Sequence, residues 1–125
     1  MTRNLERYLP LTESTAYILL ALTEPMHGYA LMRAVEEMSD GIVRIGPGTL
    51  YSAFSTLERE GLIFKVEERE RRKTYGLTAK GRQVIEAQLR RSAILVRNGR
   101  RCFDDPGVTS PAASRPEEEG EAADR

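Results

Sequence analysis

The stretch 62–77 constrains the fold most, because two short strand-like segments in it enclose a highly charged loop. Apolar residues at every second position are typical of a strand with one buried face. The loop between the segments, Glu68–Arg72, is short enough to connect them as a hairpin. We therefore expect a two-stranded hairpin, and we call its charged part, residues 68–73, the wing. The apolar residues expected to share its half-buried side are Leu62, Phe64, Val66, Tyr75 and Leu77.

Three helices are expected ahead of this hairpin, each from apolar residues at helical spacing. The first begins near Thr12, whose hydroxyl is suited to cap it, and it is apolar on most sides, so it should lie inside the core. The second covers Tyr29–Ser39. Its core-facing stripe consists of Leu31, Val35 and Met38. A β-prone run at 42–45 is expected to form a short strand before the third helix.

The third helix is expected from Pro47 or Thr49 to Glu60, with Gly61 ending it, and its two faces differ in character. The core face consists of Leu50, Ala53, Phe54 and Leu57. The opposite face carries mostly hydroxyl groups, in place of the glutamates and lysines of an ordinary solvated helix. Its members are Thr49, Tyr51, Ser52, Ser55, Thr56 and Arg59.

Three helices, a strand, a cationic hairpin and a final long helix follow the plan of a winged helix-turn-helix, an α+β fold that is mostly α. In helix-turn-helix proteins the second helix of the motif enters the DNA major groove, which is about 12 Å wide. Residues 49–60 would be this recognition helix, because small hydroxyl side chains allow a close approach and bond to phosphates or base edges. The residues expected to contact DNA are Thr49, Tyr51, Ser52, Ser55 and Arg59 of the recognition helix and Arg69, Arg71, Arg72 and Lys73 of the wing.

The charge distribution agrees with a polyanionic partner once the chain is divided. The whole sequence has 19 basic and 19 acidic residues, but residues 104–125 hold seven of the acids and two of the bases. Residues 1–103 therefore carry 17 bases and 12 acids, a net charge of +5. A positive domain is what binding to double-stranded DNA requires. Because residues 104–125 are also rich in Pro, Ser, Ala and Gly, we expect a disordered acidic tail there.

A fourth helix is expected from Thr78 to about Arg97, where Asn98-Gly99 would end it. A helix placed after the hairpin has little of its own core left to cover, so its apolar stripe favours a partner subunit. The residues of this expected homodimer interface are Ile85, Leu89, Ser92, Leu95 and Val96. The predicted organisation is a DNA-binding domain with an N-terminal arm at 1–77, a dimerisation helix at 78–103 and the acidic tail at 104–125.

The rarity of cysteine and histidine excludes several classes of function. Cys102 has no second cysteine to pair with, and together with the one histidine, His27, it is too little for the usual zinc sites. The sequence offers no nucleophile–base pair and no glycine-rich phosphate loop after a strand, so we expect neither an enzyme nor a cofactor. No apolar run approaches the roughly 18 residues of a membrane span, so we expect a cytoplasmic protein with no membrane partner.

Five short motifs occur in order between residues 11 and 97. They are Leu11-Thr12 with Ile18–Leu22, His27–Leu31, Gly48–Tyr51, Leu57–Ile63 and Tyr75–Gly81. Together they resemble the PadR family of transcriptional regulators, in its smaller subgroup without a large C-terminal domain. The resemblance implies a homodimer that binds a palindromic operator and represses transcription, with Tyr51 contacting a DNA phosphate. It also implies release from DNA by a small apolar effector that binds between the subunits.

Several alternatives without these roles stay open. The chain could be a winged-helix protein-interaction module without DNA affinity, tethered by its acidic tail. Tyr51 could be an ordinary half-buried tyrosine, and the wing arginines, interspersed with Glu68 and Glu70, could form an ordinary solvated turn. His27 is expected to have a packing or capping role and Cys102 to be an inert thiol. If DNA binding holds, the carboxylates of the tail are expected to compete with DNA for the wing.

Overall fold

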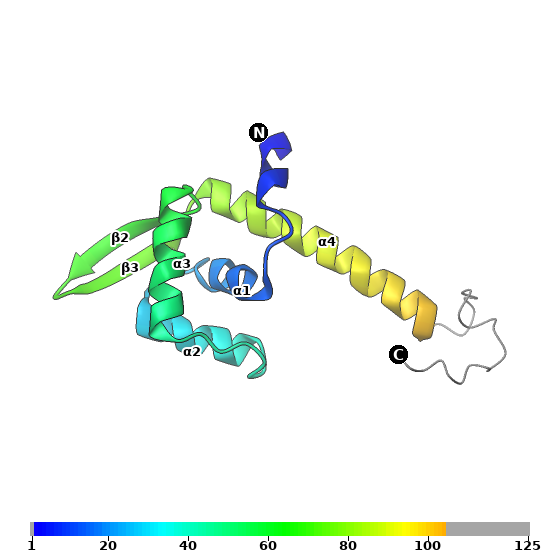
Figure 1. The fold of residues 1–125 in the computed structure, drawn as a ribbon, viewed down its shortest axis with the longest axis horizontal. Helices are drawn as coiled ribbons and strands as arrows, with labels where there is room; N and C mark the ends of the chain where they lie inside the picture. The colour runs from blue at the N-terminus through cyan, green and yellow to red at the C-terminus, as the bar shows by residue number, and fades with distance from the viewer. Residues whose placement is uncertain (1, 105–125) are drawn as a thin grey trace. The chain divides into compact units, whose positions relative to one another are not determined.

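The computed structural model describes residues 2–104, with side chains from Leu5 onward. It divides within its last helix into two compact units, the first ending at Leu89 and the second beginning at Arg90. Figure 1 labels most of the helices and strands along the chain. In order they are η1 (Thr2–Tyr8), α1 (Glu13–Ala21), β1 (Met26–His27), α2 (Gly28–Met38), α3 (Pro47–Arg59), β2 (Ile63–Arg69), β3 (Arg72–Leu77) and α4 (Ala79–Phe103).

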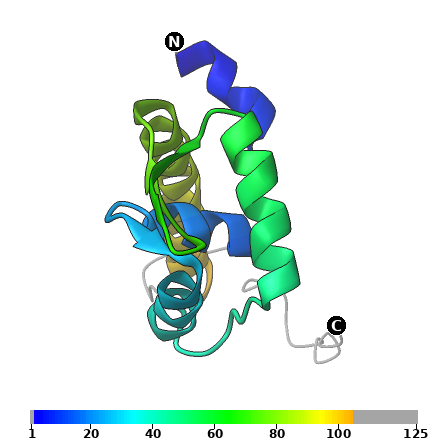
Figure 2. The same ribbon diagram turned by 90° about the vertical axis from the view of Figure 1, so that its left-hand side faces the viewer.

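Three helices of the first unit pack in sequence, α1 on α2 and α2 on α3 (Figures 1 and 2). Helix α1 begins where the sequence predicted, because the Thr15 amide donates a hydrogen bond to Thr12 Oγ1 at 3.1 Å. Its expected place in the core is confirmed, since Ile18 and Leu19 are at most 1% exposed. The predicted core face of α3 is confirmed in the same way. Its buried residues are Leu50, Phe54 and Leu57.

The three strands form one antiparallel sheet in the order β1-β3-β2. Strands β2 and β3 are the predicted hairpin, and the last pair before its turn joins Arg69 to Arg72. Strand β1 was not predicted and adds a third strand, with Met26 opposite Tyr75. The predicted strand at 42–45 is wrong: this run has no strand partner, and its Val43 and Ile45 side chains are instead buried in the core.

Three residues predicted to face the core are exposed instead. Met38 is 46% exposed, because it is the last residue of α2. Phe64 and Val66 are 47% and 44% exposed, because their neighbour Ile63 takes the core-facing position at the start of β2. The pairing of β2 with β3 is also irregular between Lys65 and Glu67, which is where Val66 lies.

Two hydrogen bonds hold the start of α4 against the end of α3, and a third caps α4 itself. The Thr78 hydroxyl donates to the Gly61 carbonyl oxygen at 2.7 Å and accepts from the Gly81 amide at 2.9 Å. The Lys80 ammonium donates to the Glu60 carbonyl oxygen at 3.0 Å, at the carboxyl end of α3 where carbonyl groups lack helical partners. These bonds explain why Thr, Lys and Gly follow the hairpin at these spacings.

Helix α4 extends further than predicted. It passes through Asn98-Gly99 and ends at Phe103, so the prediction that it stops near Arg97 is wrong. The Asn98 side-chain amide donates to the Ile94 carbonyl oxygen at 2.9 Å, within the helix, and does not form a terminating turn. Apart from Asp104, the predicted acidic tail lies outside the described residues.

Candidate nucleic-acid interface

The outer face of α3 points into solvent, as predicted. The apolar residues of α3 lie on its opposite side, in the core, and Tyr51 is 54% exposed. The remaining members of this face, all exposed, are Thr49, Ser52, Ser55, Thr56 and Arg59. The first turn of α3 contains no acidic residue and begins with Pro47, so no side-chain carboxylate there would repel a phosphate.

The wing cations differ in how they meet neighbouring acids, and Lys73, opposite Glu68 in the hairpin, interacts with that carboxylate without forming a recorded ion pair. Within the described part of the chain, Arg69 is paired with Glu67 at 3.1 Å and Lys65 with Glu68 at 2.9 Å. None of the recorded ion pairs involves the other three cations of the wing, all of which are exposed. These are Arg71, Arg72 and Lys73.

The turn of the wing has an unfavourable backbone for its residues. Glu70 and Arg71 connect β2 to β3 as a two-residue turn, with φ angles of 53° and 70°. Two positive φ angles define the hairpin turn that favours Asn-Gly, and side chains larger than glycine are strained there.

We therefore expect Glu70→Asn to raise the free energy of unfolding by roughly 0.5 to 1 kcal/mol, because asparagine tolerates the left-handed region better than glutamate. Urea denaturation of the two proteins measures this difference. The control is Glu67→Asn, which makes the same side-chain change in β2 and should give no gain. An equal gain in both variants would mean that relief of backbone strain is not the cause.

A groove of about 480 Å³ separates the wing from α3 and the start of α2. Tyr51 and Ser55 line it from α3, and residues 70–73 line it from the hairpin. The beginning of α2, residues 27–29, closes its third side. The first turn of α2 has no acidic residue and no side-chain cap, so its amide groups are available as donors to an anion. Cations, a phenol hydroxyl and a helix N-terminus therefore meet at one groove, which suits a phosphate group.

Gly28 makes this arrangement possible. A Cβ atom at this position would lie 2.9 Å from Tyr51 Oη and 3.3 Å from Leu50 Cδ2. A larger residue would push the Tyr51 hydroxyl away from the N-terminus of α2. Sequence reasoning missed His27, Gly28 and Tyr29 as part of the candidate site. One feature of the sequence could have indicated them: the start of α2 has no acidic residue and no capping side chain, as an anion-binding helix start would.

Aromatic contacts connect α3 to the hairpin and hold the groove in shape. The Phe54 ring lies between Tyr51, at a centroid distance of 6.0 Å, and Tyr75, at 4.4 Å. The Tyr75 hydroxyl donates to Glu58 Oε1 at 3.4 Å. Burial, followed by the nearby Glu58 carboxylate, raises the pKa of Tyr75. Because a phenol already titrates far above neutrality, Tyr75 remains a neutral donor.

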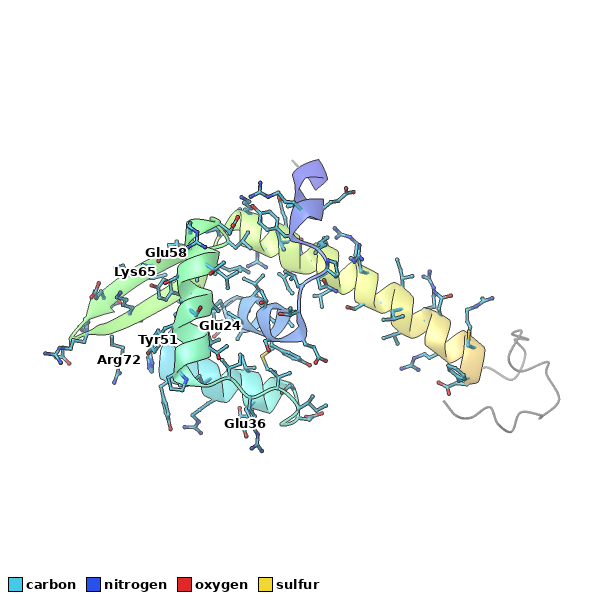
Figure 3. The ribbon with its side chains drawn as sticks, in the orientation of Figure 1. Glu24, Glu36, Tyr51, Glu58, Lys65 and Arg72 are labelled. Atoms are coloured by element: carbon cyan, nitrogen blue, oxygen red, sulfur yellow. The ribbon has the colours of Figure 1, made fainter. Side chains whose placement is uncertain are left out.

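Figure 3 labels Tyr51 and Glu58 of α3 and Lys65 of β2. Glu58 lies near Lys65 of β2, whereas Tyr51 lies toward the opposite end of α3. The hydrogen bond between Lys65 and Glu68 raises the pKa of Lys65 and lowers the pKa of Glu68, so both groups stay charged. Both groups are on the surface and on the same strand, so this pair adds little to the stability of the fold.

The structure distributes the predicted DNA-contacting residues over two hollows. Tyr51 and Ser55 share the groove with the three wing cations outside the recorded ion pairs. Thr49 and Ser52 line a second hollow of about 490 Å³, together with Thr15 of α1. Arg59 and Arg69 line neither hollow.

Within residues 2–104, none of the helices combines the length and the apolar character that a bilayer crossing needs. In the same part of the chain, no three His, Cys, Asp or Glu side chains come together as a metal site would require. Cys102 is exposed.

Comparisons with known proteins agree with this geometry. The sequence matches the family described as "Transcriptional regulator PadR-like family" over residues 18–87. An uncharacterized 37.1 kDa protein in transposon Tn4556 of Streptomyces fradiae is 40% identical over 72 residues, which cover 57% of this chain and 20% of that protein. The transcriptional regulator YqjI of Escherichia coli is 35% identical over 60 residues, which cover 48% of this chain and 29% of that protein.

The chain therefore spans less than a third of the length of these two relatives. A solved structure matches over more of its own length. The PadR family transcriptional regulator from Eggerthella lenta is 26% identical and superimposes with a TM-score of 0.56, covering 84% of this chain and 92% of that one.

Proposed function

Because the chain belongs to the PadR-like family of transcriptional regulators, which bind DNA, we propose that it is a repressor that recognises a palindromic operator as a homodimer. In this proposal α3 enters the major groove, and the wing contacts the DNA backbone beside it. A small apolar effector between the subunits stays a prediction of the family resemblance.

The observation that carries the proposal is the groove between α3, the wing and the start of α2. Its lining holds Tyr51, the α2 N-terminus and three cations outside the recorded ion pairs, against one acid, Glu70, and this balance suits the phosphates on the edge of a major groove. The neighbouring hydroxyl side chains of Thr49 and Ser52 are short enough to let the α3 backbone approach base edges. The same surface offers little to a protein partner, whose interface cores are depleted of charge.

We expect Tyr51→Phe to weaken operator binding by about 10-fold. The substitution keeps the ring and its contact with Phe54 but removes the hydroxyl group, and a hydrogen bond to a charged group contributes about 1.5 kcal/mol. A gel-shift titration on the DNA upstream of the gene measures the change. Tyr17→Phe in α1 makes the same chemical change outside the groove and should bind like the parent. Equal affinity of all three proteins would remove Tyr51 from the site.

A salt series separates this function from a protein-interaction module with the same fold. The logarithm of the affinity should fall with the logarithm of the salt concentration at a slope of about −0.9 for each phosphate contacted. A slope near zero would contradict the proposal and favour the protein-interaction module.

The proposed dimer contact rests on the apolar side of α4. Leu89, Leu95 and Val96 are 44%, 74% and 53% exposed, a large apolar surface for one helix. Phe103 is 84% exposed and shares a side of the helix with Val96, since residues seven apart lie within about 20° of each other. Ile85 is 2% exposed and belongs to the core of its own chain, so the proposed interface leaves it out.

A further inference from the structure

The second half of α4 carries an unusual concentration of positive charge. The segment Arg90–Phe103 contains five arginines and no acidic residue. All five are exposed, and none takes part in an ion pair recorded for residues 2–104. Arg90, Arg97 and Arg101 are seven and four residues apart, so they lie within about 40° of one another around the helix. We call these three residues the arginine stripe.

The needs of the helix itself do not account for the stripe. Cations in the last turn interact favourably with the helix dipole, but this effect reaches only Arg100 and Arg101. Arg90 lies more than three turns earlier. Arg97 and Arg101 are like charges four residues apart, an arrangement that destabilises a helix. The stripe lies about 100 to 140° around the helix from Val96, so it stays exposed whether or not the apolar side meets a second copy.

We propose that the arginine stripe binds an acidic cluster, residues 117–124, in the C-terminal tail of the same chain. The cluster holds five acids and no base within eight residues. They are Glu117, Glu118, Glu119, Glu121 and Asp124. Arginine forms paired hydrogen bonds with carboxylates, so a row of guanidinium groups and a row of carboxylates are chemically matched.

The length of the connecting segment fits this contact. Thirteen residues, 104–116, separate the end of α4 from the acidic cluster. If the segment behaves as the disordered tail expected from its sequence, its ends lie about 20 Å apart on average, from about 5 to 6 Å times the square root of the residue number. The distance along the helix from Phe103 back to Arg90 is also about 20 Å, at 1.5 Å per residue. The tether therefore holds the cluster at high effective concentration beside the stripe.

The wing is the other cationic surface that the cluster could bind, since the tail is expected from the sequence to compete with DNA there. The stripe is the better partner of the two. The wing cations are interleaved with Glu67, Glu68 and Glu70, which leave the wing a lower net positive charge than the stripe. The helix from Arg90 to Phe103 has no such acid. Neutralising the stripe would leave α3 and the wing as the main positive surface for a polyanion, so the tail would act against non-specific DNA binding at α4.

Nuclear magnetic resonance on the full chain at low salt tests the proposal with three variants. The first changes the stripe (R90Q/R97Q/R101Q), the second changes the wing (R71Q/R72Q/K73Q), and the third neutralises the cluster (E117Q/E118Q/E119Q/E121Q/D124N). We expect the amide signals of residues 117–124 to move to the positions of an isolated 115–125 peptide in the stripe variant only. In the cluster variant, which leaves the folded residues unchanged, the Nε–H signals of the stripe should move and those of Arg71 and Arg72 should not.

Two results would overturn the proposal by this method. In the first, the signals of residues 117–124 move to the positions of the isolated peptide in the wing variant and not in the stripe variant. In the second, these signals already match the isolated peptide in the parent chain. Titration with random-sequence duplex DNA tests the competing partner. If the stripe contacted DNA in the full chain, the stripe variant would lose about 0.9 of the salt slope for each arginine removed, which would also overturn the proposal. An unchanged slope supports it.

Discussion

Replacing Val96 by aspartate is expected to convert the protein into a monomer and to weaken operator binding by about 100-fold or more. Val96 is 53% exposed on the apolar side of α4, where the proposed dimer contact would bury it. An aspartate at this position would be an unpaired charge in an apolar interface, which costs several kcal/mol. Each monomer would then meet one half-site alone and lose the gain of two linked binding events, which is roughly 10²- to 10⁴-fold.

Sedimentation analysis and a gel shift on the same samples measure both effects. The matched control is Ile94→Asp, which puts the same charge on the same helix two residues earlier. Two residues rotate by about 200° around a helix, so residue 94 faces away from the apolar side and toward the arginine stripe. Ile94 is 48% exposed, close to Val96. If Val96→Asp stays dimeric and binds as tightly as Ile94→Asp, the subunits meet elsewhere.

The sequence predicted the helices of the first unit well, because their ends depend on local chemistry. Thr12 caps α1 through its own hydroxyl, and Gly61 follows α3 with a φ of 79° that suits glycine. The faces of α3 followed from helical spacing alone. The family and the winged-helix plan followed from the order of these elements and the motifs between them.

Local signals failed where tertiary contacts decide the outcome. Strand β1 has two residues, too few for a pattern, and forms because Met26 lies beside Tyr75 of β3. The run at 42–45 has strand-like residues but no neighbouring strand to pair with. Asn98-Gly99 is a common helix end, yet α4 continues through it, with the Asn98 side chain bonded to the Ile94 carbonyl oxygen within the helix.

The candidate site was predictable in its parts but not in its assembly. The hydroxyl face of α3 and the cations of the wing were read from composition and spacing. The groove depends on Gly28 admitting the Tyr51 hydroxyl at the N-terminus of α2, a contact between positions 23 residues apart. No pattern in one sequence reports such an approach.

The second large effect is expected for stability, and it concerns Gly81 in the first turn of α4. A Cβ atom at this position would overlap the Leu62 carbonyl oxygen and lie 2.8 Å from Leu77 Cδ1. The oxygen belongs to the backbone, and it accepts a hydrogen bond from the Thr78 amide at 3.1 Å, so it does not yield as a flexible side chain would. Gly81→Ala should therefore force α4 away from the base of the hairpin.

We expect this single methyl group to lower the free energy of unfolding by about 3 kcal/mol, the upper end of the cost of overpacking a core. That is a large share of the roughly 5 to 15 kcal/mol that stabilises a domain. The loss should exceed the gain of up to about 1 kcal/mol that alanine normally brings to a helix. Thermal and urea denaturation of the two proteins measure the difference.

Gly48→Ala is the matched control, because this glycine also lies in the first turn of a helix, α3, and its added Cβ would meet nothing within 4 Å. It should be neutral or slightly stabilising. Displacement of α4 would also break the bonds from Thr78 to Gly61 and from Lys80 to Glu60. Hydrogen exchange in Gly81→Ala should therefore rise at the end of α3 as well as in α4. A variant as stable as Gly48→Ala, with unchanged exchange there, would show that the Leu62 carbonyl leaves room for a Cβ atom at residue 81 and would contradict the prediction.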